Sequence, residues 1–460
     1  MKLVLLSGGS GKRLWPLSND CRSKQFLKVL TSPDNEPESM VQRVWRQLRM
    51  AGLLNNSYIA TGSGQVDILQ SQLGFDVPTI IEPERRDTYP AIALAATYLY
   101  SILGVSLNEV IAILPVDPYV EDRFFEKIKQ LKSVVYGSGA DLALVGVKPT
   151  YPSEKYGYIV PQHFEVDRQQ EPYIEVSHFT EKPREDKAME LIEQQALWNC
   201  GVFAFKLDFL INHLISQGLP IQYEEMLKQY TRLPKISFDY AVVEKSERIV
   251  ALPYNGYWKD LGTWNTLTDE MTNHHIGKGI IANDCNNTYL INELEIPVTV
   301  IGLSNVIIAS SPDGILVSDR DASPRIKEVN KQIEQRPMYE ERRWGWYKVL
   351  DYSKIHHGGE VLTKRICIYA GKNLSYQYHV KRNEVWTIIS GSGELMLDEK
   401  LYPVKMGDVL HIPAGARHSI RADEDLELIE VQQGSELVED DIVRLETSWE
   451  EIMRKLATSY

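Results

Sequence analysis

A glycine-rich turn followed by basic residues, close to the N-terminus, has the composition of a phosphate-binding loop. It follows the apolar run Leu3–Leu6, and its candidate ligand-binding residues are Gly8, Gly9, Gly11, Arg13 and Lys24. Glycine has no Cβ, so backbone N–H groups can close around a phosphate, and fixed positive charge can neutralise it. The spacing fits neither G-x-G-x-x-G nor the P-loop. The stretch therefore indicates a polyphosphate site of another kind, with an ordinary glycine turn as the alternative.

Two aspartates stand where apolar runs end. Asp117 follows the run Val110–Leu114, and Asp260 lies in Tyr257–Trp264, where an apolar run gives way to a glycine turn. Mg²⁺ prefers one or two carboxylates together with phosphate oxygens and water. The pair predicts a magnesium site against a nucleotide's phosphates. Turn or helix-capping aspartates are the alternative.

Polar residues that could read a sugar lie between the two aspartates. They are Tyr156, Gly157, Glu181, Lys182 and Asn199. Taken singly, each could belong to a loop or to core packing. Together they have the composition of a polar sugar site.

These residues need a scaffold, and strand and helix patterns alternate along the first part of the chain. The expected elements, in order, are a helix over 40–50, a strand over 58–61, a helix over 65–73, a strand over 79–81, a helix over 90–103 and a strand over 110–114. Such alternation predicts an α/β fold with a mostly parallel, Rossmann-like sheet. Ligands of that fold bind beyond the carboxyl ends of the strands, where the glycine turn and Asp117 both fall.

Length and composition limit the class of protein. The chain has 460 residues, so we expect two or three domains, and its net charge of −13 argues against nucleic acid or an anionic membrane as partner. The four cysteines show no C-x-x-C spacing, as in a reducing compartment. No segment has the pattern of a signal peptide or a membrane span. We expect a soluble, cytoplasmic protein.

Short strands dominate the C-terminal part. Runs over 364–369, 385–389, 393–397 and 409–412 are separated by glycine, aspartate and proline turns, and a helical pattern returns only at 447–456. This pattern predicts a small jelly roll and resembles the cupins. Gln377 and His379 lie two apart and so share one face of a strand; with Glu384 and His418 they could hold a divalent metal such as Zn²⁺. The alternative is that these four residues only pack inside the barrel and bind no metal.

The order of motifs resembles the sugar-phosphate nucleotidyltransferases, and most closely the long bacterial mannose-1-phosphate guanylyltransferases. The resemblance runs through Gly8–Ser18, Lys24–Phe26, Glu82-Pro83, Arg86, Thr88, Pro90–Ala96, Pro115–Asp117, Tyr156–Tyr158, Glu181–Pro183, Trp198-Asn199, Phe238–Ala241 and Asp260. It implies a nucleotidyltransferase domain over 1–272, a β-rich segment and linker over 273–340, a cupin over 341–446 and a C-terminal helix over 447–460. Residues 325–333 are expected to form a helix and 334–343 a linker.

The resemblance also implies roles for the candidate residues. GTP and mannose 1-phosphate would be the substrates, Asp117 and Asp260 would hold Mg²⁺, and Arg13 and Lys24 would neutralise the triphosphate. Glu181, Lys182, Asn199 and the backbone at Gly157, beside Tyr156, would bind the sugar phosphate. The stretch Arg86, Asp87 and Thr88 would lie near the base. A homo-oligomer, in particular a dimer, is expected.

The sequence departs from the family pattern in both parts. Asp87 stands where the family has Asn, which exchanges an amide donor for a carboxylate and bears on base preference. In the cupin, Lys381 and Val385 replace two histidines of the type II phosphomannose isomerases, while Arg382 is kept. Isomerisation needs a base, and imidazole suits that role near pH 7. Three alternatives stay open: another sugar 1-phosphate or base, a structural cupin without isomerase activity, and a non-catalytic sugar-nucleotide sensor.

Overall fold

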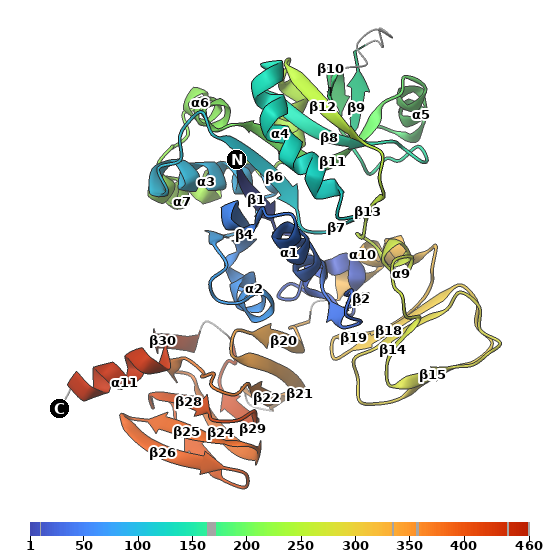
Figure 1. Ribbon diagram of the computed structural model, residues 1–460. Coiled ribbons are helices and arrows are strands. Elements are labelled where there is room, and N and C mark those ends of the chain that lie inside the picture. Colours follow the sequence, from blue (N-terminus) through green and yellow to red (C-terminus); the bar gives the residue numbers. More distant parts are fainter. Residues whose placement is uncertain (10, 163–171, 334, 356–357, 439–440, 459–460) are drawn as a thin grey trace.

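The computed structural model describes residues 1–9, 11–162, 172–333, 335–355, 358–438 and 441–458. Within these residues the N-terminal part contains a nine-stranded sheet (Figure 1). Its strands, in spatial order, are β5 (Thr79–Glu82), β4 (Ser57–Gly62), β1 (Lys2–Leu6), β6 (Val110–Pro115), β11 (Leu197–Lys206), β8 (Leu142–Val147), β12 (Ile249–Tyr254), β10 (Ile174–Thr180) and β9 (Tyr158–Pro161). β1 pairs in parallel with β4 and β6, whereas β11 and β10 are antiparallel to the strands beside them. The α/β fold with a mostly parallel sheet is confirmed.

Helices cover both faces of this sheet, which is why β1 is apolar on both sides. Apolar side chains of α1 (Met40–Met50), α2 (Val66–Leu73), α4 (Phe124–Ser138) and α5 (Glu185–Glu193) form the core on one face. Those of α3 (Thr88–Thr97), α6 (Leu207–Ser216), α7 (Tyr223–Gln229) and α8 (Phe238–Ala241) form the core on the other. A capping box fixes the start of α1, because Ser39 and Gln42 bond each other's backbone N–H.

Two of the two-stranded ribbons in the described residues lie beside the main sheet. In one, β7 (Pro118–Val120) pairs antiparallel with β13 (Trp258–Asp260). In the other, β2 (Leu30–Thr31) pairs with β3 (Pro37–Glu38). The first ribbon matters for function because it joins two segments that are far apart in the sequence.

A β-rich segment follows the short helix α9 (Trp264–Thr268). Its elements are β14 (His275–Gly277), β15 (Gly279–Ile281), β16 (Tyr289–Asn292), β17 (Val298–Val300), β18 (Val306–Ser311), β19 (Gly314–Asp319) and α10 (Ile326–Val329). β14, β16 and β18 pair in parallel, as do β15 and β17. Leu14 and Leu17 of the N-terminal turn share a core with Trp264 and Ile307, so this segment packs on the glycine turn. The helix expected over 325–333 consists of three short helical pieces.

The C-terminal part is a double sheet, as expected for a cupin. One sheet has the order β20 (Tyr339–Arg342), β21 (Gly345–Ile355), β22 (Gly359–Ile368), β29 (Leu426–Gly434), β24 (Arg382–Ser390) and β27 (Val409–Ile412). The other has the order β26 (Lys400–Lys405), β25 (Ser392–Leu397), β28 (His418–Ala422), β23 (Tyr376–His379) and β30 (Ile442–Glu446), and α11 (Trp449–Thr458) follows. The linker predicted over 334–343 is wrong at 339–342, because this stretch pairs with β21 as a cupin strand.

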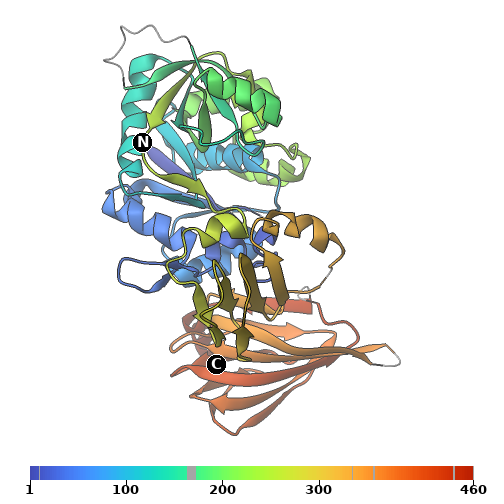
Figure 2. The same ribbon diagram turned by 90° about the vertical axis from the view of Figure 1, so that its right-hand side faces the viewer.

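The cupin lies at one end of the molecule, below the α/β part (Figures 1 and 2). Helix α2 and strand β20 are side by side, and Arg342 of β20 forms an ion pair with Asp67 of α2 at 3.4 Å. In the described part of the chain, no helix is long and apolar enough to cross a bilayer.

Candidate active site

The ribbon of β7 and β13 brings the two predicted metal-binding aspartates together. Asp117 lies between β6 and β7, and Asp260 ends β13 directly opposite Pro118. Their side chains are each 32% exposed and converge on one amine. Two half-buried carboxylates that face a common point form an oxygen-only donor set, which suits Mg²⁺.

Lys24 supplies that amine. Its Nζ lies 2.7 Å from Asp117 Oδ2 and 3.4 Å from Asp260 Oδ1, and its side chain is only 13% exposed. Burial lowers the pKa of Lys24, but the two carboxylates outweigh burial and raise it above its ordinary value. The lysine therefore stays charged beside both acids. Arg13 is exposed on the neighbouring 3-10 helix Lys12–Leu14, close enough to oppose that rise.

The glycine turn touches the backbone that carries Lys24. A Cβ on Gly11 would lie 2.6 Å from Ser23 Cα and 2.9 Å from Lys24 N, so only glycine fits here. Ser23 Oγ in turn donates to the carbonyl oxygen of Gly9 at 2.7 Å. The turn and the basic segment are thus one packed unit at the end of β1. Ser10, between these glycines, lies outside the described residues.

Gly11→Ala is expected to lower kcat by about 100-fold, because the added methyl group must push Ser23 and Lys24 away from the aspartates. Steady-state kinetics with a thermal melt on the same sample would measure the effect. Gly137→Ala is the matched control, since a Cβ at this position in α4 meets nothing within 4 Å. Equal kinetics for the two variants would contradict the role of the close contact.

The segment Arg86–Thr88, expected near the base, forms hydrogen bonds with Leu233 and Phe238. Arg86 Nε donates to the carbonyl oxygen of Leu233 at 2.9 Å, and Thr88 Oγ1 accepts from the N–H of Phe238 at 2.8 Å. Asp87 adopts φ +75° and caps α3 by accepting from the N–H of Thr88. Burial raises the pKa values of Glu181 and Asp239, and the nearby carboxylate of Asp87 adds a smaller contribution to both rises, so Asp87 lies beside the predicted sugar site.

The predicted sugar-binding residues do come together around β11. The N–H of Asn199 donates to the carbonyl oxygen of Gly157 at 2.8 Å, and a Cβ on Gly157 would lie 2.5 Å from Glu181 Oε2. Lys182 forms an ion pair with the buried carboxylate of Glu181. Tyr156 packs on Trp198 at 4.8 Å between ring centroids. Burial, and then the charge of Asp260, raise the pKa of Tyr156, so this ring joins the sugar side to the metal side.

Asp239 is a site residue to which the sequence interpretation gave no role. Asn199 Nδ2 donates to Asp239 Oδ1 at 2.8 Å, so the two side chains form one hydrogen-bonding surface. Burial, and then the neighbouring Glu181, raise the pKa of Asp239 to about 7. The sequence does contain a feature that could have indicated this role, because Asp239 lies in Phe238–Ala241, one of the segments that resemble the family.

Asp239→Asn is expected to stabilise the protein at neutral pH. The pKa of this carboxyl rises from 3.8 to about 7 on folding. Its ionisation therefore lowers the free energy of unfolding as the pH rises above 4, and this loss is complete above pH 7. The wild type should lose stability over that range, and the amide variant should lose less of it. Urea unfolding between pH 4 and 8 measures both, with Asp76→Asn as an exposed control. Parallel pH profiles for Asp239→Asn and the wild type would contradict the assignment.

The cupin holds a second polar cluster, formed by His379, Glu384 and His418. One ligand atom from each lies within 4.8 Å of the others, and all three side chains are buried. The ring nitrogens His379 Nδ1 and His418 Nε2 have no hydrogen-bond partner among the described residues. Burial lowers the pKa values of the two histidines to about 3 and about 4, so both rings are neutral. Gln377, the fourth predicted ligand, accepts from Ser375 Oγ at 2.7 Å and lies opposite His418.

A protein cation already contacts this cluster. Arg382 Nε donates to Glu384 Oε1 at 3.0 Å, and Arg382 Nη2 lies 3.4 Å from His379 Nε2. A second buried acid, Glu430, shares the indole N–H of Trp386 with Glu384. The histidine and glutamate donors fit a divalent metal by type, while the guanidinium supplies positive charge in the same place.

Fold and site together define the class: an α/β protein that gathers two carboxylates and a lysine at the carboxyl end of its sheet, as expected of nucleotidyltransferases. A family model described as nucleotidyl transferase matches residues 2–275, and the chain belongs to this family. A second model, described as mannose-6-phosphate isomerase C-terminal, matches residues 329–447.

Similar proteins cover nearly the whole chain. The xanthan biosynthesis protein XanB of Xanthomonas campestris pv. campestris is 32% identical, over 97% of this chain and 98% of its own. The mannose-1-phosphate guanylyltransferase of Salmonella muenchen is 30% identical, over 96% and 97% respectively. A crystal structure titled mannose-1-phosphate geranyltransferase, from Thermus thermophilus, is 26% identical and covers 73% of this chain and 99% of its own, with a TM-score of 0.60. The family resemblance read from the motifs is confirmed.

Proposed function

We propose that this chain transfers a guanylyl group from GTP to mannose 1-phosphate and so makes GDP-mannose and pyrophosphate. The observation that carries the proposal is the convergence of Lys24, Asp117 and Asp260 at the end of the parallel strands. The relative named mannose-1-phosphate guanylyltransferase, aligned over almost all of both chains, supports this choice of substrates. The XanB relative is named for xanthan biosynthesis, and a role in polysaccharide biosynthesis is part of this proposal.

In the proposed reaction an oxygen of the sugar phosphate attacks the α-phosphorus of GTP. A new phosphorus–oxygen bond forms as the α–β phosphoanhydride bond breaks, and pyrophosphate leaves with that electron pair. The attacking phosphate is already an anion, so the protein has no proton to remove. Its task is to align the reactants and stabilise negative charge.

The residues divide this task between them. Lys24 and Arg13 neutralise the triphosphate, and Lys182 holds the phosphate of the sugar. Glu181 accepts hydrogen bonds from the sugar hydroxyl groups, and Asn199 donates hydrogen bonds to them. Asp117 and Asp260 would hold Mg²⁺, which when bound supplies charge neutralisation of the phosphates. Tyr156 lies between the sugar-binding residues and the metal-binding aspartates.

Pyrophosphate release is the direct test. Purified protein with Mg²⁺ and mannose 1-phosphate is assayed with each nucleoside triphosphate in turn, and then with GTP and a panel of sugar 1-phosphates. We expect release with GTP and mannose 1-phosphate, with GDP-mannose recovered as product. Faster release with another base or sugar would replace the substrates but keep the class. Binding without any release would instead support a sugar-nucleotide sensor.

We propose further that the cupin does not isomerise sugar phosphates. The cavity beside its polar cluster is lined, among the described residues, by neither histidine nor cysteine. Its carboxylate Glu430 is engaged by Gln432 Nε2 at 2.8 Å and by Trp386. Mannose 6-phosphate formation from fructose 6-phosphate, with and without added Zn²⁺, tests this: turnover in either condition would overturn it.

The location and assembly of the protein are proposals too. We propose that the protein is cytoplasmic and forms a homodimer. Cell fractionation and light scattering of the full chain test them.

A further inference from the structure

The segment that carries Lys24 is too short to fix its own position. It is a single turn of 3-10 helix, Lys24–Phe26, in which the N–H of Phe26 donates to the carbonyl oxygen of Ser23 at 3.0 Å. Short 3-10 turns have poor hydrogen-bond geometry, so their surroundings must stabilise them. The position of Lys24 between the two aspartates therefore depends on what this segment contacts.

Arg22, two residues before Lys24, is buried against two carboxylates from later parts of the chain. Its Nη1 lies 2.8 Å from Glu293 Oε2, just after β16, and its Nε lies 3.7 Å from Glu341 Oε1 on β20. Burial lowers the pKa of Arg22, but Glu293 and then Glu341 raise it above its ordinary value, so the guanidinium keeps its charge. The side chain is 8% exposed, and a buried cation is costly without its carboxylates. The position of Arg22 is therefore set by the β-rich segment and by the cupin.

The carboxylate of Glu341 acts on both ends of the segment that carries Lys24. Its Oε1 faces Arg22, and its Oε2 accepts from Gln72 Nε2 of α2 at 3.3 Å. The same amide of Gln72 also donates to the carbonyl oxygen of Phe26 at 2.9 Å. The side chain of Glu341 is 9% exposed, so water competes little for either contact. One carboxylate of the cupin thus contacts Arg22 directly and Phe26 through Gln72.

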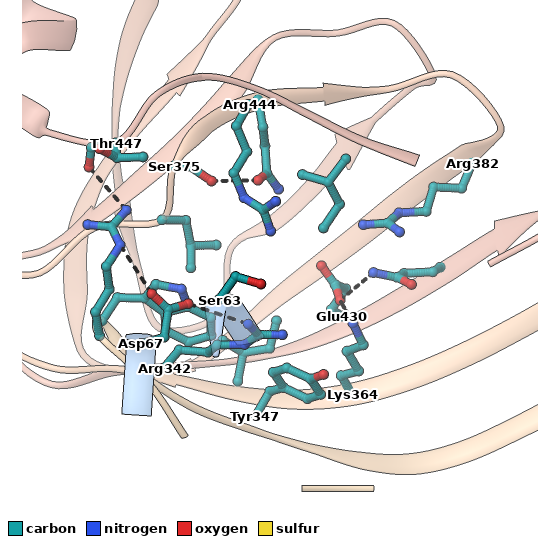
Figure 3. A pocket seen from close by; sticks show the side chains of 17 residues that line it. Ser63, Asp67, Arg342, Tyr347, Lys364, Ser375, Arg382, Glu430, Arg444 and Thr447 are labelled. Atoms are coloured by element: carbon teal, nitrogen blue, oxygen red, sulfur yellow. Dashed lines mark hydrogen bonds and ion pairs between the residues drawn. The ribbon is translucent and has the colours of Figure 1, made fainter. Parts of the chain in front are cut away.

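Further contacts fix strand β20 beside this segment. Arg342, the next residue of β20, points toward Asp67 of α2 and forms an ion pair with it at 3.4 Å (Figure 3). Asn19 Nδ2, in the loop that leads to the segment, donates to Asp313 Oδ2 at 2.8 Å. Asp313 Oδ1 in turn accepts from the N–H of Met338, directly before β20, at 2.7 Å. The strand therefore has a fixed position relative to both α2 and the loop.

We propose that Glu341 and Arg22 are positioning residues for nucleotidyl transfer, through which the cupin places Lys24 between Asp117 and Asp260. This inference rests on the proposed function. Neither residue belongs to the cluster of the lysine and the two aspartates, so each acts only through the segment that carries Lys24. Small displacements of a group that stabilises charge are costly to catalysis. The cupin therefore serves the transfer reaction whether or not its own polar cluster holds a metal.

Kinetics of the full-length protein test this role with Glu341→Gln, which removes the charge that faces Arg22 and keeps the shape of the side chain. We expect kcat/KM for GTP to fall by about tenfold or more, because Lys24 faces the triphosphate in the proposed reaction. The KM for mannose 1-phosphate should stay within about twofold of the wild type, because Lys182 holds that phosphate. Glu399→Gln is the matched control, since Glu399 is a cupin carboxylate that is also paired with an arginine but is 52% exposed.

A double-mutant cycle shows whether Glu341 acts through Arg22. Arg22→Met removes the same contact from the other side, and urea unfolding checks its folding. If the two residues act through one contact, the double variant should lose about as much kcat/KM for GTP as the more affected single variant. Independent losses, whose fold-changes multiply, would overturn the shared role. So would a KM for mannose 1-phosphate that rises as much as the KM for GTP, because a general loss of structure affects both substrates.

Hydrogen–deuterium exchange of the backbone measures the same contacts without catalysis. Peptides that cover residues 16–27 should exchange at least about threefold faster in Glu341→Gln than in the wild type, while peptides of β6 keep the wild-type rate. Faster exchange of both regions would mean a general loss of stability and would overturn the positioning role. Unchanged exchange over residues 16–27 would overturn it too, as would faster exchange with unchanged kcat/KM in an active protein.

These readouts separate the inference from the proposed function. A wild type that releases no pyrophosphate with any pair of substrates overturns the proposed function, and local exchange that depends on Glu341 then still supports the placing of Lys24 by the cupin. An active wild type whose Glu341→Gln variant equals the Glu399→Gln control overturns the inference and leaves the proposed function standing.

Discussion

Asp260→Asn is expected to lower kcat for pyrophosphate release by about 1000-fold or more, with the fold intact. The amide keeps the size of the side chain but removes one of the two negative charges that face Lys24. Asn also binds a hard divalent cation less strongly than a carboxylate does. The substituted residue lies at the end of β13, whose pairing with β7 uses the backbone, so the ribbon should persist.

Steady-state kinetics over a range of Mg²⁺ concentrations would measure this effect, with circular dichroism and a thermal melt as the checks of folding. We also expect the half-saturating Mg²⁺ concentration to rise. Asp34→Asn, an exposed carboxylate in the turn between β2 and β3, is the matched control. Turnover of Asp260→Asn close to that of the control would exclude the two-carboxylate scheme.

The sequence locates Asp117 and Asp260 but cannot show how they meet. Each is recognisable because it follows an apolar run, and that is local information. Their meeting depends on β7 and β13, strands of three residues each that are far apart in the chain. Strand pairs that short have no periodicity to detect. From the sequence, only the family resemblance, and not the pattern of apolar residues, indicates that Asp117 and Asp260 act together.

The role of Asp239 is hidden for a similar reason. Its neighbours Phe238 and Tyr240 look like ordinary packing, and its partner Asn199 lies on a different element. A carboxyl with a raised pKa is visible only once burial and nearby charges are known. The strand β20 was missed because Tyr339–Arg342 is mostly charged, and only its pairing with β21 makes it a strand.

The sequence could not predict the cavity that Asp67 of α2 lines together with Arg342, Arg343 and Arg444 of the C-terminal part. Asp67 is one acidic residue on an amphipathic helix, and Arg342 and Arg343 fall in a stretch that has the composition of a linker. Only the packing of α2 against β20 brings these charges together.

Arg382→Ala is expected to destabilise the cupin by about 3–5 kcal/mol. Arg382 is 4% exposed and bonds Glu384, which is 2% exposed, in a space that also contains the buried Glu430. Without the guanidinium, two buried carboxylates face each other, and Lys364 is left as a cation 3.9 Å from Glu430. Uncompensated buried charge is far more costly than the lost hydrogen bond.

Urea unfolding, followed by the fluorescence of Trp386 and its neighbours, would report the effect on this domain. Arg417→Ala, an exposed arginine of the same barrel, should change the free energy of unfolding by less than about 0.5 kcal/mol. If the cost comes from charge, then Arg382→Met combined with Glu384→Gln should recover much of it, because both members of the ion pair are then neutral. A double variant as unstable as Arg382→Ala would mean that packing, not charge, makes this arginine necessary. Recovery would instead show that Arg382 is needed inside the barrel to balance the buried charge of Glu384.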